Sequence, residues 1–178
     1  AYDPATPGEP AQGGAVWNAG TFVATETAFH TNSARAGKGG TDIIGSVMRQ
    51  ERPGGDALGG AIYSTGSVLL TNCTFKSGLT LGGKGGNGYL GARGGEAKGG
   101  AILNAGGSVT CMGGVFEANS ASAGLDGSYG RDGYRGNAFG GGICTTGTLR
   151  LASTSFSSNG VAGTVGCGGA VAHLQGSA

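Results

Sequence analysis

Aromatic and basic side chains alternate with glycine in two stretches of the chain, a composition suited to ligand binding. Tyr–Arg–Gly clusters can stack on sugar rings or on bases. The side chains concerned are Tyr89, Arg93, Tyr129, Arg131, Tyr134 and Arg135. We interpret them as a candidate ligand face. The simpler alternative is that they are solvated loop tips that keep a glycine-rich region soluble.

Carboxylates are the usual carriers of glycan-cleaving chemistry, which needs two that converge, or one with basic partners. Of the ten Asp and Glu residues, only Glu26 and Glu117 fall in or beside predicted strands, and they occupy different repeat positions. The four cysteines include no CxxC pair, and His30 and His173 lack metal-ligand spacing. We therefore predict no catalytic residue, no metal site and no cofactor.

One motif could carry a covalent modification. Asn72-Cys73-Thr74 is an N-glycosylation sequon, and strand alternation places Asn72 on the outside. In a secretory eukaryote Asn72 is a candidate glycan acceptor, whereas in a bacterium the sequon is a chance match.

Charge and hydropathy argue against two classes of partner. The net charge of +1 provides no field that would attract nucleic acid or an anionic membrane. No apolar run approaches the ~20 residues needed to span a bilayer. We expect neither nucleic-acid binding nor membrane insertion.

A repeated segment organises the chain and must position all these side chains. Copies start near residues 13, 59, 99, 140 and 168, each opening with a double glycine. A β-branched column follows at Val16, Ile62, Ile102, Ile143 and Val171, and an aromatic column closes the strands at Phe29, Phe75, Phe116 and Phe156. Most length variation lies after the Phe. This pattern predicts an all-β parallel β-helix of about four to five coils, stacked at ~4.8 Å.

Other repeat positions give more detailed expectations. A polar column should form a corner ladder at Asn18, Ser64, Asn104, Thr145 and His173. Its preceding neighbours should point outward and need a cover; they are Trp17, Tyr63, Leu103, Cys144 and Ala172. Cys73, Cys111 and Cys144 should act as small hydrophobes in the stacked core. The third copy has one extra residue before Phe116, which we place as a bulge at Gly113-Gly114.

The two halves of the repeat support a family resemblance. GGAV with FHTN, GGAI with FEAN and GGGI with FSSN resemble the GGA[IV]/FxxN repeat pair of chlamydial polymorphic membrane proteins. The resemblance covers Gly13 to about Val171 and departs at Phe75-Lys76-Ser77-Gly78, where the Asn is missing. It implies a right-handed parallel β-helix displayed outside the cell, often as an adhesin.

The loops between coils have a three-residue glycine period. In two of them the glycines are Gly82, Gly85, Gly88, Gly91 and Gly94, and Gly124, Gly127, Gly130, Gly133 and Gly136. Three residues per turn is the period of polyproline II, and glycine every third residue leaves one bare edge. We predict that these loops lie parallel as an ordered polyglycine II layer against the β-helix. The alternative is a flexible, low-complexity loop.

The ends of the chain lack the polar caps of a soluble solenoid. Residues 1–12 resemble the tail of a preceding coil's loop, because Gly8-Glu9-Pro10-Ala11-Gln12 matches, with one inserted residue, the Gly-polar-Ala signature that ends the first three loops. Open solenoid ends favour self-association or contact with other subunits.

These observations favour a non-catalytic extracellular or cell-surface module, structural or adhesive, within a larger assembly, with glycans as candidate ligands. The alternative is a polysaccharide-binding or polysaccharide-degrading β-helix protein. An ice-binding surface would require a regular Thr ladder, and the column Thr21, Ser67, Gly107, Thr148 is too broken for one.

Overall fold

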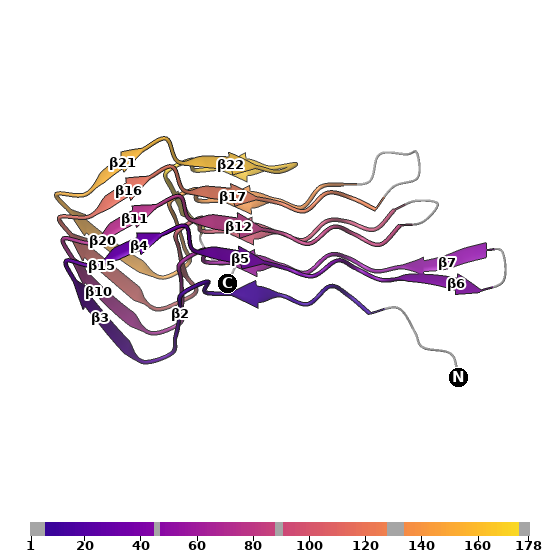
Figure 1. The fold of residues 1–178 in the computed structure, drawn as a ribbon, viewed down its shortest axis with the longest axis horizontal. Helices are drawn as coiled ribbons and strands as arrows, with labels where there is room; N and C mark the ends of the chain where they lie inside the picture. The colour runs from indigo at the N-terminus through magenta and orange to yellow at the C-terminus, as the bar shows by residue number, and fades with distance from the viewer. Residues whose placement is uncertain (1–5, 45–46, 88–90, 128–133, 175–178) are drawn as a thin grey trace.

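The computed structural model describes residues 6–44, 47–87, 91–127 and 134–174. All regular secondary structure within these residues is β-strand. Five columns of short parallel strands wind into a solenoid (Figure 1). The predicted parallel β-helix is confirmed.

Each column collects the same repeat position from successive coils. The column after the double glycines contains β2 (Val16–Asn18), β9 (Ile62–Ser64), β14 (Ile102–Asn104), β19 (Ile143–Thr145) and β24 (Val171–His173). The next contains β3 (Thr21–Thr25), β10 (Ser67–Thr71), β15 (Ser108–Met112) and β20 (Thr148–Ala152). The third contains β4 (Ala28–His30), β11 (Thr74–Lys76), β16 (Val115–Glu117) and β21 (Ser155–Ser157).

The last two columns lie in segments that the repeat pattern assigned to loops. One contains β5 (Ser33–Arg35), β12 (Leu79–Leu81), β17 (Ser120–Ser122) and β22 (Gly160–Ala162). The other contains β1 (Ala11–Gln12), β8 (Ala57–Leu58), β13 (Ala97–Lys98), β18 (Ala138–Phe139) and β23 (Gly166–Cys167). The Gly-polar-Ala signature therefore marks the strand that returns to the coil.

Single residues in the left-handed conformation turn the chain at three points of each coil. The first point is the leading glycine of the double glycine, for example Gly59 with φ of 67°. The other two are held largely by non-glycine residues: Glu26, Asn72, Gly113 and Ser153, then Thr31, Ser77, Ala118 and Ser158. The second glycine has a different role, since a Cβ at Gly60 would collide with the carbonyl oxygen of Gly100. The double glycine thus combines a turn with close coil stacking.

The interior contains columns of like residues from successive coils. The rings of Phe29, Phe75, Phe116 and Phe156 stack with centroid separations of 4.6, 4.7 and 4.9 Å. Ile62, Ile102 and Ile143 lie in the same core, together with Cys73 and Cys111. The expected inward Ile and Phe columns are confirmed.

Cys144 lies outside that core, which corrects part of the cysteine prediction. It is buried with Leu103 and Ala172 in a second cluster on the outer side of the β9–β14–β19 column, where Leu58 and Phe139 cover it. Strand alternation turns Cys144 away from the interior because Ile143 already points inward. The returning strands β8 and β18, and not the glycine loops, therefore cover this part of the outward apolar column, while Trp17 remains 58% exposed.

Asparagine side chains connect one coil to the next. Asn18 Nδ2 donates to Ser64 Oγ at 2.9 Å, and Asn104 Nδ2 donates to Thr145 Oγ1 at 2.9 Å. In the FxxN motif, Asn119 Nδ2 donates to the carbonyl oxygen of Phe75 at 2.9 Å, and Oδ1 accepts from the amide of Gly78 at 2.8 Å. A Cβ at Gly78 would lie 2.6 Å from the carbonyl oxygen of Gly100. The glycine that replaces Asn at this position fits that close contact.

The predicted bulge at Gly113-Gly114 is wrong. Ser67 pairs with Ser108 and the register stays constant through Phe75 and Phe116, so the extra residue precedes β15. It lies at the corner containing Gly106, where φ is 97°. Ser108 therefore follows Ser67 in the column, with Ser108 Oγ donating to Ser67 Oγ at 3.2 Å. Hydroxyl side chains therefore form a continuous column, Thr21, Ser67, Ser108 and Thr148. The next outward column differs in residue type from coil to coil: Val23, Leu69, Thr110 and Arg150.

Candidate functional site

The loops project from the coil as pairs of limbs that run out and back (Figure 1). Outbound limbs comprise residues 36–40, 82–87 and 124–127, and returning limbs comprise residues 6–10, 52–56, 91–96 and 134–137. We call these limbs together the glycine plate. The first loop continues into an antiparallel hairpin of β6 (Thr41–Ile44) and β7 (Val47–Glu51), which the glycine period did not lead us to expect.

Backbone hydrogen bonds join the outbound and returning limbs in a zigzag ladder. The amides of Gly55, Gly83, Gly95, Gly124 and Gly136 donate to the carbonyl oxygens of Gly37, Gly55, Gly83, Gly95 and Gly124 respectively, at 2.9–3.1 Å. A second ladder runs three residues further out, where Gly86 donates to Arg52 and Ala92 donates to Gly86. Bonds within each layer complete the network, as when Gly39 donates to Lys84.

The limbs are hydrogen-bonded side by side in the described residues, as the predicted glycine layer requires, but the arrangement differs from the prediction. Each loop contributes two limbs because the chain must return to the coil, so the plate has two layers with opposite chain directions. It also extends away from the coil instead of lying against it (Figure 1).

Glycine is required in the ladder because the limbs approach backbone to backbone. A Cβ at Gly83 would collide with the carbonyl oxygen of Gly37, and one at Gly95 would collide with that of Gly55. Gly124 stands in the same relation to Gly83, and Gly136 to Gly95. In limb 82–87 the neighbouring glycines are also closed to a side chain, because a Cβ at Gly82 would collide with the carbonyl oxygen of Gly95 and one at Gly85 with that of Ala92. Two positions of each three-residue turn are therefore bare there, and the third carries a side chain.

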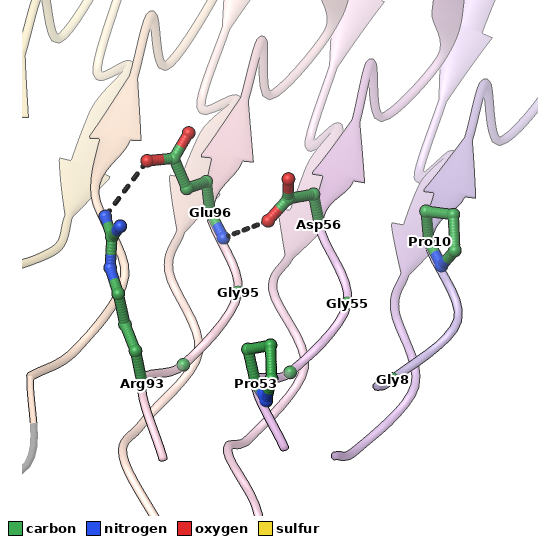
Figure 2. A pocket seen from close by; sticks show the side chains of 10 residues that line it. Gly8, Pro10, Pro53, Gly55, Asp56, Arg93, Gly95 and Glu96 are labelled. Carbon is green, nitrogen blue, oxygen red and sulfur yellow. Dashed lines mark hydrogen bonds and ion pairs between the residues drawn. The ribbon is translucent and has the colours of Figure 1, made fainter. Parts of the chain in front are cut away.

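A cavity of about 390 Å³ lies over the returning limbs, lined by Pro10, Pro53, Asp56, Arg93 and Glu96 (Figure 2). Asp56 Oδ1 accepts the backbone amide of Glu96 at 2.7 Å. Glu96 in turn pairs with Arg93 Nη2 at 3.0 Å and with Lys98 Nζ at 2.8 Å. The charges over this cavity are therefore mostly compensated within the protein.

Asp56 and Glu96 are a pair that the sequence pattern did not identify. They share one column on adjacent coils, as Ala57 and Ala97 next to them are paired. Burial alone would raise the pKa of Glu96, but the hydrogen bonds and charges of Lys98 and Arg93 outweigh it and hold that pKa below its ordinary value. Glu96 is thus ionised at neutral pH and suits a structural or anionic role better than proton donation.

A second cavity of about 390 Å³ lies over the outbound limbs. Its cationic lining residues are Lys38, Lys84 and Arg135, and its apolar ones include Leu81 and Leu125. No acidic side chain lines it. This cavity therefore contrasts in charge with the one over the returning limbs.

The structure describes three of the six side chains of the predicted ligand face. Tyr89, Tyr129 and Arg131 lie outside the described residues. Arg93 lines the returning-limb cavity and Arg135 the outbound-limb cavity, so these two do not converge. Tyr134 is 70% exposed beside Arg135 in the chain.

The remaining candidate residues are distributed over the coil. Glu26 sits at a left-handed corner, while Glu117 lies in β16 and pairs with Lys76 of the preceding coil at 3.1 Å. Asn72 is exposed at its own left-handed corner, as strand alternation predicted. Among the described residues, no group of three or more His, Cys, Asp or Glu side chains could hold a metal ion.

The four thiols should differ sharply in reactivity. Cys73, Cys111 and Cys144 are buried, whereas Cys167 is exposed. Burial raises the pKa of Cys111 and raises that of Cys144 to about 11. We expect one thiol per chain to react rapidly with a disulfide reagent at pH 8, and four after denaturation. Two or more fast thiols in the native protein would contradict this burial.

The same pKa shifts predict a loss of stability in alkali. A folded thiol that keeps its proton where the unfolded thiol has lost it favours the folded state only at lower pH. The free energy of unfolding should therefore fall as the pH rises from about 8.5 toward about 11. Urea titrations at pH 7, 9 and 10.5 would measure the fall, and replacing Cys144 with Ala should reduce its size.

None of the segments that the structure describes forms a helix long and apolar enough to cross a membrane. The functional proposal must come from the geometry of the plate and the coil, since comparison with protein-family models, curated proteins and solved structures gave no match.

Proposed function

We propose that this protein is a non-catalytic structural or adhesive module of an extracellular or cell-surface assembly, in which the β-helix carries the glycine plate as a rigid display surface. The observation behind this proposal is the zigzag hydrogen-bond ladder of the plate. Backbone bonds such as Gly95 to Gly83 fix limbs that would otherwise be flexible. Side chains on a fixed framework bind with a smaller loss of conformational entropy.

The proposed partners are other subunits of the same assembly and glycans. The GGA[IV]/FxxN resemblance supports a place on the cell surface. The plate supports adhesion, because its limbs extend away from the coil (Figure 1) and carry exposed side chains such as Lys84 and Arg93.

Cleavage of a polysaccharide is the alternative that Asp56 and Glu96 make worth testing. Acidic side chains on adjacent coils can flank a bound sugar, but glycoside hydrolysis requires one carboxyl that remains protonated near neutral pH. The lowered pKa of Glu96 does not meet that requirement. Binding without cleavage is therefore the version that we favour.

The test combines retention and chain-length measurements on the same samples. The full chain is incubated with a panel of neutral and acidic polysaccharides, followed by co-sedimentation of an immobilised protein and size-exclusion analysis of the polymer. We expect retention of at least one polymer with no change in its length. New chain ends that accumulate in proportion to protein concentration would overturn the non-catalytic proposal.

Order in the plate provides an independent test of the display role. Amides at Gly83, Gly95 and Gly124 should exchange with solvent far more slowly than in the unfolded chain, because each donates to a carbonyl within the ladder. Exchange at the unfolded rate throughout 82–87 and 91–96 would contradict a rigid display surface.

A further inference from the structure

Side chains on the outbound limbs form an ordered outward row. Lys38, Lys84 and Leu125 each follow a ladder glycine, namely Gly37, Gly83 and Gly124. The bonds from Gly39 to Lys84 and from Gly85 to Leu125 set the three limbs in register. All three side chains are exposed and line the same cavity. The ladder therefore fixes the spacing of two lysines along one edge of the cavity.

Arg135 adds a third cation from a different limb. It belongs to the returning limb 134–137, yet it lines the cavity over the outbound limbs. Its Nε atom is buried and has no hydrogen-bond partner within the described part of the chain. Buried donors are rarely left unpaired in folded proteins, and the absence of a partner at Nε leaves the charge of Arg135 without an acceptor there.

The positive charge of this cavity is uncompensated within the described residues, where Lys38, Lys84 and Arg135 form no ion pair. Arg93 and Lys98 on the returning limbs differ, since both pair with Glu96. An ion-paired surface favours solubility, whereas converging unpaired cations create an anion site.

The rest of the lining is mostly apolar. It consists of Ala36, Leu81, Ala123 and Leu125, together with Ser122 and the glycines Gly82, Gly83 and Gly124. Such a floor suits the C–H face of a sugar ring, while the cations suit acidic groups at the edge of the ring. The volume of about 390 Å³ lies in the lower part of the range for ligand pockets, roughly 300–1,000 Å³.

We propose that the cavity lined by Lys38, Lys84 and Arg135 binds an acidic polysaccharide, a chain of sugars that carry carboxylate or sulfate groups. This proposal rests on the proposed display function, because the lysines share a row only while the ladder holds. Nucleic acid fits less well, since the cations border aliphatic side chains and the chain as a whole carries a net charge of only +1.

The test measures binding of the full chain to polygalacturonate, dextran sulfate, neutral dextran and duplex DNA by calorimetry at low and moderate salt. Polygalacturonate and dextran sulfate separate carboxylate from sulfate recognition. We expect binding to at least one of them, weakening as salt is added, and no binding to neutral dextran. The double variant Lys38→Gln/Lys84→Gln should bind about tenfold more weakly.

Two further variants make the result specific. Arg150→Gln removes an exposed cation from β20 on the coil and should leave affinity unchanged. Arg135→Gln should weaken binding without lowering the melting temperature, since the Nε atom has no partner to lose.

Failure of this inference can be separated from failure of the display function. Slow amide exchange in the plate together with no binding to either acidic polymer would overturn only the ligand assignment. Equal affinity of wild type and the double lysine variant, or tighter binding to DNA than to both acidic polymers, would overturn it as well. Rapid exchange throughout the limbs would instead count against the display function.

Discussion

Replacing Gly95 with alanine should open the glycine plate while leaving the coil folded. The new Cβ would collide with the carbonyl oxygen of Gly55, and Gly95 both donates to Gly83 and accepts from Gly124. Overpacking and two weakened hydrogen bonds together should cost about 3 kcal/mol in the local opening free energy. Hydrogen exchange read by mass spectrometry should show lost protection in 82–87, 91–96 and 124–127, but not in β10 or β15.

Gly160→Ala is the matched control for this substitution. Gly160 begins β22, its φ lies outside the left-handed region, and a Cβ there would meet no atom within 4 Å. The free energy of unfolding of the Gly160→Ala variant should stay within about 0.5 kcal/mol of the wild-type value. If Gly95→Ala kept wild-type protection in the limbs, the zigzag ladder would not exist in solution.

Truncating Phe116 to alanine should produce the largest loss of global stability. Its ring is fully buried and stacks on Phe75 at 4.7 Å and on Phe156 at 4.9 Å. The lost transfer free energy and the cavity left between two rings should cost about 3–5 kcal/mol. Urea unfolding followed by circular dichroism would measure this loss.

Phe156→Ala tests whether position in the stack determines the cost. Phe156 is half-buried, and within the described ladder it stacks on Phe116 alone. Its truncation should therefore cost clearly less than that of Phe116. Equal losses at the two positions would show that stacking from both sides adds nothing.

The coil could be predicted from sequence because its interior repeats one residue type at one position. The Ile and Phe columns recur at nearly constant spacing, so burial and alternation assign them without reference to distant contacts. The same regularity revealed the outward apolar column and its need for a cover. Which segment covers it could not be predicted, since Leu58 and Phe139 reach the outer cluster only through the return of the loops.

The extra residue of the third copy was placed wrongly because the prediction counted residues and did not use the alternation of inward and outward side chains. A bulge at Gly113-Gly114 would pair Ser108 with Val68 and turn a polar residue inward. An extra residue at the Gly106 corner keeps Val109 and Cys111 in the core. Side-chain alternation within β15 would have located the extra residue before this strand, because a shift of one residue exchanges the two faces of a strand.

The glycine period predicted order in the loops but not their arrangement. The period identifies the residues without side chains. It does not show whether the glycine edge of one limb packs against a limb that runs in the same direction or in the opposite direction. The hairpin of β6 and β7 had a signal, since Thr41, Ile43, Ile44 and Val47 favour strands on either side of Gly45-Ser46. Predicting the pair of Asp56 and Glu96 required the register between adjacent coils. The Gly-polar-Ala signature supplies this register once the segment is recognised as a strand.

Each of the first three coils contributes one outbound and one returning limb to the plate, so in these coils solenoid and plate share one unit of growth. Because the ladder bonds join backbone atoms, a duplicated unit would extend both without requiring matched side chains elsewhere. Substitutions at outward positions such as Lys38, Lys84 and Leu125 leave that framework intact. Gene duplication can therefore enlarge the surface, and point mutation can diversify it, as two independent evolutionary steps.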